Sequence, residues 1–140
     1  MPFETRSSIF LHLVWATWDR LPMLVPPVVE QVYRVVGAEC AAAGGEVIAL
    51  GGVEDHIHLL VRLPPTVAAA ELMQRVKGVS AHLVTHDTGE QAHFKWQRGY
   101  GVASVSPSHV PQVTRYIARQ REHHAEGELH PALELGGDGD

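Results

Sequence analysis

Two histidines one residue apart open a strand-like stretch of the chain, EDHIHLLV at residues 54–61. Side chains alternate between the two faces of a β-strand, so His56 and His58 share one face. The opposite face of residues 56–63 is uniformly apolar and comprises Ile57, Leu59, Val61 and Leu63. Strand geometry places the Cβ atoms of His56 and His58 about 7 Å apart. Two neutral imidazoles at this spacing can hold a divalent metal ion.

Two acidic residues, Glu54 and Asp55, directly precede this pair and are candidates to accept a hydrogen bond that orients one of the rings. The spacing of the pair is weak support by itself, because the chain contains 10 histidines. The hypothesis of a metal site therefore depends on where the pair lies, on a strand whose other face is apolar.

A tyrosine near the C-terminal end is the second candidate for chemistry. In VTRYIARQREHH, Tyr116 and Gln120 are four residues apart and share one face of a predicted helix, with Arg115 and Arg119 beside them. A tyrosine next to cations and a metal can act as a nucleophile toward phosphate. The amide oxygen of Gln120 is an oxygen ligand of the kind that Mg²⁺ and Mn²⁺ accept. Taken alone, the helix equally fits a half-buried tyrosine beside a solvated arginine face.

The elements that must position these residues follow from hydrophobic periodicity and from the glycines and prolines. The predicted ranges are a strand at 7–18, a helix at 28–44, strands at 46–53 and 56–63, a helix at 67–86, a glycine-interrupted strand at 94–106 and a helix at 107–124. The two middle strands are so close in sequence that we expect an antiparallel hairpin. The first six elements predict an α+β fold of the ferredoxin-like βαββαβ type, with an antiparallel sheet and its helices on one face. The last helix and the histidine pair would then lie on the other, open face.

Composition indicates one domain at residues 1–124, followed by an acidic, flexible tail at 125–140. The single cysteine, Cys40, excludes an internal disulfide framework and favours the cytoplasm. We expect neither a signal peptide nor a membrane-spanning helix. The net charge of −5 is unevenly distributed, because residues 56–121 hold 8 lysines and arginines against 3 acids. A local positive field of this kind suits a phosphate-bearing partner.

Taken together, these motifs resemble a known family. A strand with His-hydrophobic-His and a later helix with YIxxQ resemble the TnpA-type single-tyrosine HUH transposases of small bacterial insertion sequences. The resemblance covers about residues 7–124. The matching segments are EDHIHLLV, KGVSAHL (77–83), FKWQRGYGVASVS (94–106) and VTRYIARQREHH (113–124).

The resemblance implies a metal-dependent transposase that acts on single-stranded DNA with hairpin ends. His56, His58 and Gln120 would bind Mg²⁺ or Mn²⁺, and Tyr116 would form a 5′-phosphotyrosine link during excision and insertion of an insertion-sequence element. The resemblance also implies a homodimer. Cationic residues expected to bind DNA phosphates are Arg75, Lys77, Lys95, Arg98, Arg115 and Arg119. Trp96 and Tyr100 are candidates to stack on unpaired bases, and Tyr100 is the less favoured alternative nucleophile.

Two other functions stay open from the sequence. One is a domesticated relative that binds hairpin DNA or RNA without cutting it. The other is a small zinc hydrolase using His56, His58 and either His123 or His124. The histidines without a partner pattern are interpreted as structural or solvated: His12, His82, His86, His93, His109 and His130.

Overall fold

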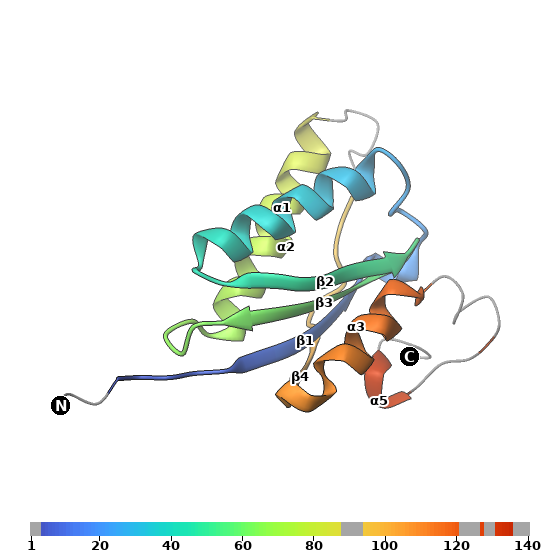
Figure 1. Ribbon diagram of the computed structural model, residues 1–140. Coiled ribbons are helices and arrows are strands. Elements are labelled where there is room, and N and C mark those ends of the chain that lie inside the picture. The colour runs from blue at the N-terminus through green and yellow to red at the C-terminus, as the bar shows by residue number, and fades with distance from the viewer. Residues whose placement is uncertain (1–3, 88–93, 121–126, 128–130, 136–140) are drawn as a thin grey trace.

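Four strands form one antiparallel sheet in the order β2-β3-β1-β4 (Figure 1). The computed structural model describes residues 4–87, 94–120, 127 and 131–135. Its strands are β1 (Ile9–Ala16), β2 (Glu46–Val53), β3 (His56–Leu63) and β4 (Gly101–Val105). Its α-helices are α1 (Val28–Ala42), α2 (Ala69–Asp87), α3 (Val110–Ala118) and α5 (Pro131–Glu134), with short 3-10 turns η1 (Trp18–Arg20) and η2 (Pro107–His109). This order and pairing confirm the predicted ferredoxin-like α+β fold.

The central strand β3 carries the histidine pair. It pairs with β2 on one side and with β1 on the other, so that His58 lies opposite Gly51 and Val14. Only Glu54 and Asp55 separate β2 from β3, which confirms the predicted antiparallel hairpin. His56 and His58 are therefore fixed by two ladders of backbone hydrogen bonds, one on each side.

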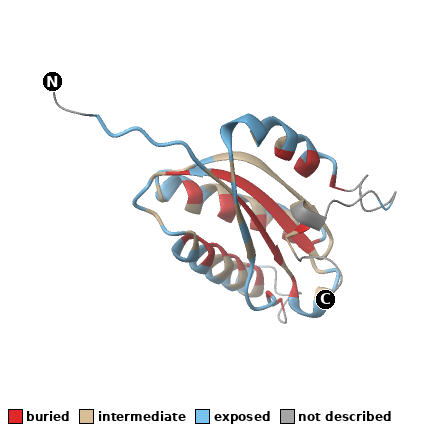
Figure 2. Ribbon diagram, turned by 90° about the horizontal axis from the view of Figure 1, so that it is seen from below, coloured by how far each residue is buried: buried red, intermediate tan, exposed pale blue. Residues whose placement is uncertain are grey.

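Helices α1 and α2 cover one face of the sheet, where the main hydrophobic core lies. The apolar face predicted for β3 points into this core, and its side chains are 0–2% exposed. Figure 2 shows the buried residues along the central strands and on the sides of the two helices that face them. The alternation in the sequence thus predicted the two faces of β3 correctly.

The opposite face of the sheet is covered as well. Helix α3 packs on β2 and β3 through a second apolar cluster in which Leu60, Val113 and Ile117 are buried. His56 and His58 lie on this face, and both are 0% exposed. Helix α3 thus covers the sheet face on which the sequence placed the last helix. The histidine pair lies on this covered face and is enclosed.

Three segments differ from the sequence prediction. Only Gly101–Val105 of the predicted strand 94–106 joins the sheet, because the chain turns at Gly99 (φ +80) and Trp96 makes just an isolated bridge with Thr17. The predicted helix 107–124 starts with η2 and continues as α3 to Ala118; residues 121–124 lie outside the described part. Residues 131–134, predicted to belong to a flexible tail, form α5 beside α3. Among the described residues, no helix has the length and apolar character needed to span a membrane.

A glycine in β2 lets α3 approach the sheet. A methyl group on Gly51 would lie 2.7 Å from the backbone carbonyl oxygen of Ile117, closer than real contacts allow. We expect Gly51→Ala to lower the free energy of unfolding by about 1–3 kcal/mol, the usual cost of overpacking. Gly78→Ala is the matched control, because nothing lies within 4 Å of the added carbon in α2, and it should stabilise the helix by about 0.5–1 kcal/mol. Urea unfolding of both variants measures the difference, and equal effects would show that Gly51 is not a contact point.

Candidate metal and nucleophile site

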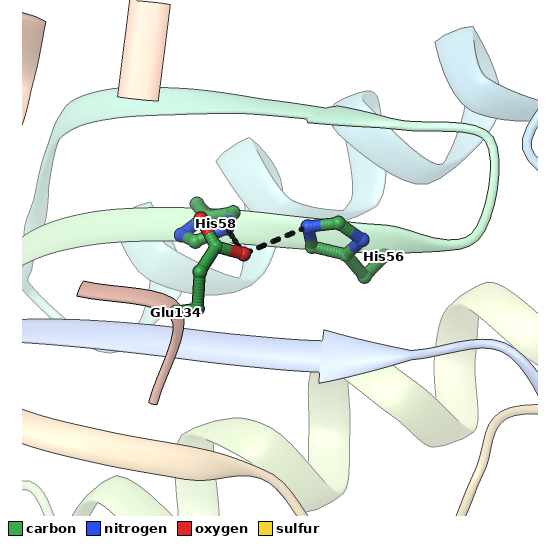
Figure 3. Close-up of side chains that lie close together, drawn as sticks. All are labelled: His56, His58 and Glu134. Atoms are coloured by element: carbon green, nitrogen blue, oxygen red, sulfur yellow. Dashed lines mark hydrogen bonds and ion pairs between the residues drawn. The ribbon is translucent and has the colours of Figure 1, made fainter. Parts of the chain in front are cut away.

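One carboxylate lies against both histidines of β3. Glu134 Oε1 is 3.4 Å from His56 Nε2 and 3.3 Å from His58 Nε2 (Figure 3). The glutamate comes from α5, more than 70 residues further along the chain, and is 2% exposed. The ring centroids of His56 and His58 are 5.1 Å apart. The three side chains therefore enclose one small buried volume.

Helix α3 adds Tyr116 to the same volume, and Gln120, two residues beyond the end of α3, adds its amide. The Tyr116 hydroxyl donates a hydrogen bond to Glu134 Oε2, and Gln120 Nε2 donates to the same oxygen at 3.4 Å. Tyr116 is 4% exposed and Gln120 1% exposed. The four residues singled out by spacing, from two distant segments, are thus brought together around one carboxylate.

The sequence did not indicate Glu134. Its segment, HPALELGG, lies in a stretch that composition assigns to a tail. The available signal was local: a proline is followed by a short turn in which Leu133 and Leu135 flank the acid. In the structure Leu133 packs against the cluster under α3, and this contact places Glu134 over the histidines.

Carboxylates hold His56 in its charged form. Burial lowers the pKa of His56, but the hydrogen bond from its Nδ1 to Asp55 Oδ1 at 2.8 Å and the ion pair of its Nε2 with Glu134 at 3.4 Å outweigh this and raise the pKa to about 9. The hydrogen bond to His56 is the largest of the effects that lower the pKa of Asp55, and Arg20 assists at 3.3 Å. Burial raises the pKa of Glu134, but the ion pair with His56 and the hydrogen bonds with His58 and Tyr116 outweigh it and hold the pKa well below its usual range. Asp55 therefore has the orienting role expected for an acid beside the pair.

His58 has a different partner at its second nitrogen. His12, on the neighbouring strand β1, places its Nε2 atom 2.9 Å from His58 Nδ1. His12 is 1% exposed. The sequence interpretation gave His12 no partner, because residues 12 and 58 are far apart in the chain and meet only through the pairing of β1 with β3.

The donor set fits a divalent cation. The ligand atoms of His56, His58 and Glu134 all lie within 4.8 Å of one another, as they must if one ion is to contact all of them. Imidazole nitrogens combined with a carboxylate oxygen suit Mn²⁺, Mg²⁺ and other first-row divalent ions. Gln120 provides a further side chain with an oxygen at the edge of this set.

The cationic residues predicted to bind DNA are spread over the molecule. Arg75 lies on α2, across the sheet from Tyr116, and pairs with Glu39 at 2.6 Å. Lys77 donates to the backbone carbonyls of Gln97 and Gly99, which fixes the segment before β4. Lys95 lies over the ring of Trp18 at 4.1 Å.

The remaining cations belong to the segments around Tyr116 and α5. Arg115 is exposed on α3, the helix of Tyr116, and Arg119 is exposed directly after its end. Arg98 lines a cavity of about 400 Å³ together with Arg20, Tyr100 and Leu135, the residue next to Glu134. Tyr100 is 37% exposed there, whereas Trp96 is buried in the core, where its indole nitrogen donates to Ser80. Base stacking is therefore sterically open to Tyr100 and not to Trp96. His123 and His124 lie outside the described residues.

Comparison with known proteins gives a consistent result. The family model described as "Transposase IS200 like" matches residues 5–120. The ISDra2 transposase TnpA of Deinococcus radiodurans is 28% identical over 116 residues, which cover 79% of this chain and 83% of that protein. The transposase for insertion sequence element IS200 of Salmonella typhimurium is 31% identical over 101 residues, which cover 68% of this chain but only 57% of that longer protein.

Two solved structures share the fold. A candidate transposase from Deinococcus radiodurans R1 superimposes with a TM-score of 0.66 at 26% identity, covering 86% of this chain and 96% of that one. A REP-associated tyrosine transposase, bound to a REP hairpin, also gives a TM-score of 0.66, at 13% identity and with 92% and 76% of the two chains covered. Since the family match includes all four strands and the helices α1 to α3, the chain belongs to the family of IS200-like transposases.

Proposed function

We propose that this transposase cuts and rejoins single-stranded DNA with Tyr116 as its nucleophile and with a divalent metal ion, Mg²⁺ or Mn²⁺, at His56 and His58. The observation that carries the proposal is the convergence on Glu134: the Tyr116 hydroxyl contacts one oxygen of this carboxylate, and both imidazoles face the other. The Glu134 carboxylate thus contacts the proposed nucleophile and the proposed metal ligands at the same time. In the proposed reaction, the scissile phosphate must also lie between Tyr116 and the metal ion.

The residues have separate roles in the proposed reaction. His56 and His58 would hold the ion through Nε2, with an oxygen from Glu134 or Gln120, and the ion would polarise the phosphate. The Tyr116 oxygen attacks phosphorus, a Tyr–O–P bond forms, and the bond from phosphorus to the 3′ oxygen breaks. The phenol proton is released, the departing 3′ oxygen takes up a proton from solvent, and a 5′-phosphotyrosine results. Attack by another 3′-hydroxyl reverses these bond changes and joins the strands, which would excise or insert the element.

Access of the DNA requires a movement at α5. Tyr116 is 4% exposed and its hydroxyl is engaged by Glu134. The scissile phosphate therefore reaches the tyrosine only after residues 133–135 move away from α3. The exposed cations Arg98, Arg115, Arg119 and Lys95 are proposed to bind the neighbouring phosphates. Arg75 and Lys77 are better explained by the contacts they make within the protein.

The proposed substrate is single-stranded DNA with hairpin ends, in the cytoplasm, and the proposed active form is a homodimer. The hairpin bound by the REP-associated relative supports the choice of substrate. The first experiment incubates the protein and Mn²⁺ with a labelled panel of single-stranded hairpin oligonucleotides and resolves the products on a denaturing gel. We expect a slow band that protease removes. Binding in a native gel without any covalent band would favour the hairpin-binding relative, and hydrolysis only with Zn²⁺ would favour the zinc hydrolase.

Metal affinity should depend strongly on pH, because protons and the ion compete for His56. With a pKa of about 9, His56 is protonated at neutral pH in the metal-free protein, and an ion requires the neutral ring. We expect the association constant for Mn²⁺ to rise about tenfold per pH unit between pH 7 and 9 and then to level off. Calorimetry in two buffers of different ionisation enthalpy measures the affinity and the proton released.

Asp55→Asn is the matched control for this pH dependence. Removing the carboxylate that holds the His56 proton should lower its pKa, so the affinity should level off at a lower pH. The metal-free protein provides an independent check. A folded-state pKa raised above the usual 6.5 stabilises the fold most below pH 6.5, and this stability should be lost as the pH rises through about 9. An affinity that does not change with pH would contradict the assignment of His56 as a ligand.

A further inference from the structure

We infer that His12 is a positioning residue of the metal site: by accepting a hydrogen bond from His58 Nδ1, it holds His58 in the tautomer whose Nε2 lone pair is available to the ion. This inference rests on the proposed metal site and adds to it a residue that does not touch the metal. The observation is the 2.9 Å contact between His12 Nε2 and His58 Nδ1, both on fully enclosed rings.

The pairing of β1 with β3 makes this contact structurally necessary. Val14 lies opposite His58 and His12 lies opposite Leu60, so the two histidines are diagonal neighbours on the same face of the sheet. Their rings stack at a centroid distance of 5.1 Å with an angle of 27° between the planes. Neither ring can turn toward water, because His12 is 1% exposed and His58 0% exposed. The nitrogens at the contact must therefore satisfy each other.

The hydrogen shared in this contact determines which nitrogen of His58 can bind a metal ion. Each neutral ring has one N–H donor and one lone pair, so the two facing nitrogens share a single hydrogen. If His58 Nδ1 carries it, His58 Nε2 has a lone pair and can bind an ion. If His12 Nε2 carries it, His58 must have its own hydrogen on Nε2, where it can only donate to Glu134. Metal binding thus selects the first arrangement, in which His12 is the acceptor.

His56 and His58 have different kinds of orienting partner, a carboxylate and an imidazole. The charges already present in the site explain this difference. His56 is oriented by Asp55, which is partly exposed and paired with Arg20. A carboxylate at position 12 would instead be enclosed near the carboxylate of Glu134, and burying a second negative charge there is costly. A neutral imidazole supplies the acceptor without a charge.

The test measures Mn²⁺ affinity by calorimetry for three variants and the wild type. His12→Phe keeps a ring but removes the acceptor, and we expect its dissociation constant to rise about 10- to 100-fold, the usual effect of losing an outer partner of a metal histidine. His12→Gln places an amide oxygen near the position of Nε2 and should restore most of the affinity. His82→Phe makes the same exchange on the exposed side of α2 and should bind as the wild type does. Metal-free melting temperatures are recorded for all variants.

The outcomes separate this inference from the proposed function. Wild-type affinity in His12→Phe would overturn the role of His12 and leave the metal site intact. A wild type that binds no Mn²⁺ would overturn both. A loss that His12→Gln does not restore would indicate a packing role and would also overturn the inference.

A measurement on the wild type avoids any dependence on the folding of variants. In ¹⁵N-histidine-labelled protein saturated with a diamagnetic divalent ion, Mg²⁺ or Zn²⁺, His58 should carry a slowly exchanging hydrogen on Nδ1. Its Nε2 should carry none. A hydrogen on His12 Nε2 in the metal-bound state would overturn the inference.

Discussion

Tyr116→Phe is expected to abolish the covalent protein–DNA product while leaving hairpin binding within about threefold of the wild type. The substitution removes only the hydroxyl oxygen, the atom that contacts Glu134 in the site. Loss of a nucleophile costs on the order of 10³-fold or more in rate, so the adduct should fall below detection. Tyr116 is 4% exposed and its ring meets the ring of His58 edge to face, and phenylalanine retains that ring. Labelled hairpin oligonucleotides, Mn²⁺ and a denaturing gel measure the adduct; a native gel measures binding.

Tyr100→Phe is the control for this result. Tyr100 is the alternative nucleophile, it is 37% exposed, and it lines the cavity beside Leu135. We expect both the adduct and DNA binding to persist in this variant, because phenylalanine keeps the ring face on which a base can stack. An adduct retained in Tyr116→Phe and lost in Tyr100→Phe would reverse the assignment of the nucleophile.

His58→Ala is expected to have the second large effect, on metal affinity. The variant removes one of the two proposed imidazole ligands and also the partner of His12. Outer partners of metal histidines typically contribute 10- to 100-fold, so loss of the ligand itself should weaken Mn²⁺ binding by more than about 100-fold. The covalent product should be lost in parallel. Calorimetry and the gel assay on the same preparation measure both quantities.

His82→Ala controls for the removal of a histidine as such. His82 is exposed on α2 and lies against the tilted ring of His86, across the sheet from the proposed ion. We expect unchanged affinity and unchanged adduct formation. Since His58 is enclosed, the melting temperature of His58→Ala must be reported with its affinity. A folded His58→Ala that binds Mn²⁺ as tightly as the wild type would remove His58 from the ligand set.

The sequence by itself determined most of the fold, because local periodicity carries it. In β3 the apolar residues recur at every second position, and this alternation predicted which face enters the core under α1 and α2. The two residues between β2 and β3 predicted the hairpin, since so short a connection joins only antiparallel strands. The predicted strand 94–106 was wrong in its first half, because the bonds from Lys77 to the carbonyls of Gln97 and Gly99 hold that segment outside the sheet.

The sequence also proposed the candidate ligands and the nucleophile, since their spacing is local. A two-residue separation on a strand places His56 and His58 on one face, and a four-residue separation on the predicted helix brought Tyr116 and Gln120 together as candidates, although α3 itself ends at Ala118. That the strand and the helix meet is a property of α3 packing on β2 and β3. Spacing within either segment contains no information about it.

Only the tertiary structure identified Glu134 and His12. Glu134 reaches the histidines because Leu133 packs under α3, and His12 reaches His58 because β1 and β3 pair in one particular register. Both contacts join residues more than 40 positions apart, Glu134 to His58 at 76 positions and His12 to His58 at 46. The protonation of the site follows from such contacts, because burial and neighbouring charges set the pKa of each group. Local sequence patterns predict the residue types that can do chemistry, whereas their charge states and partners are decided by long-range packing.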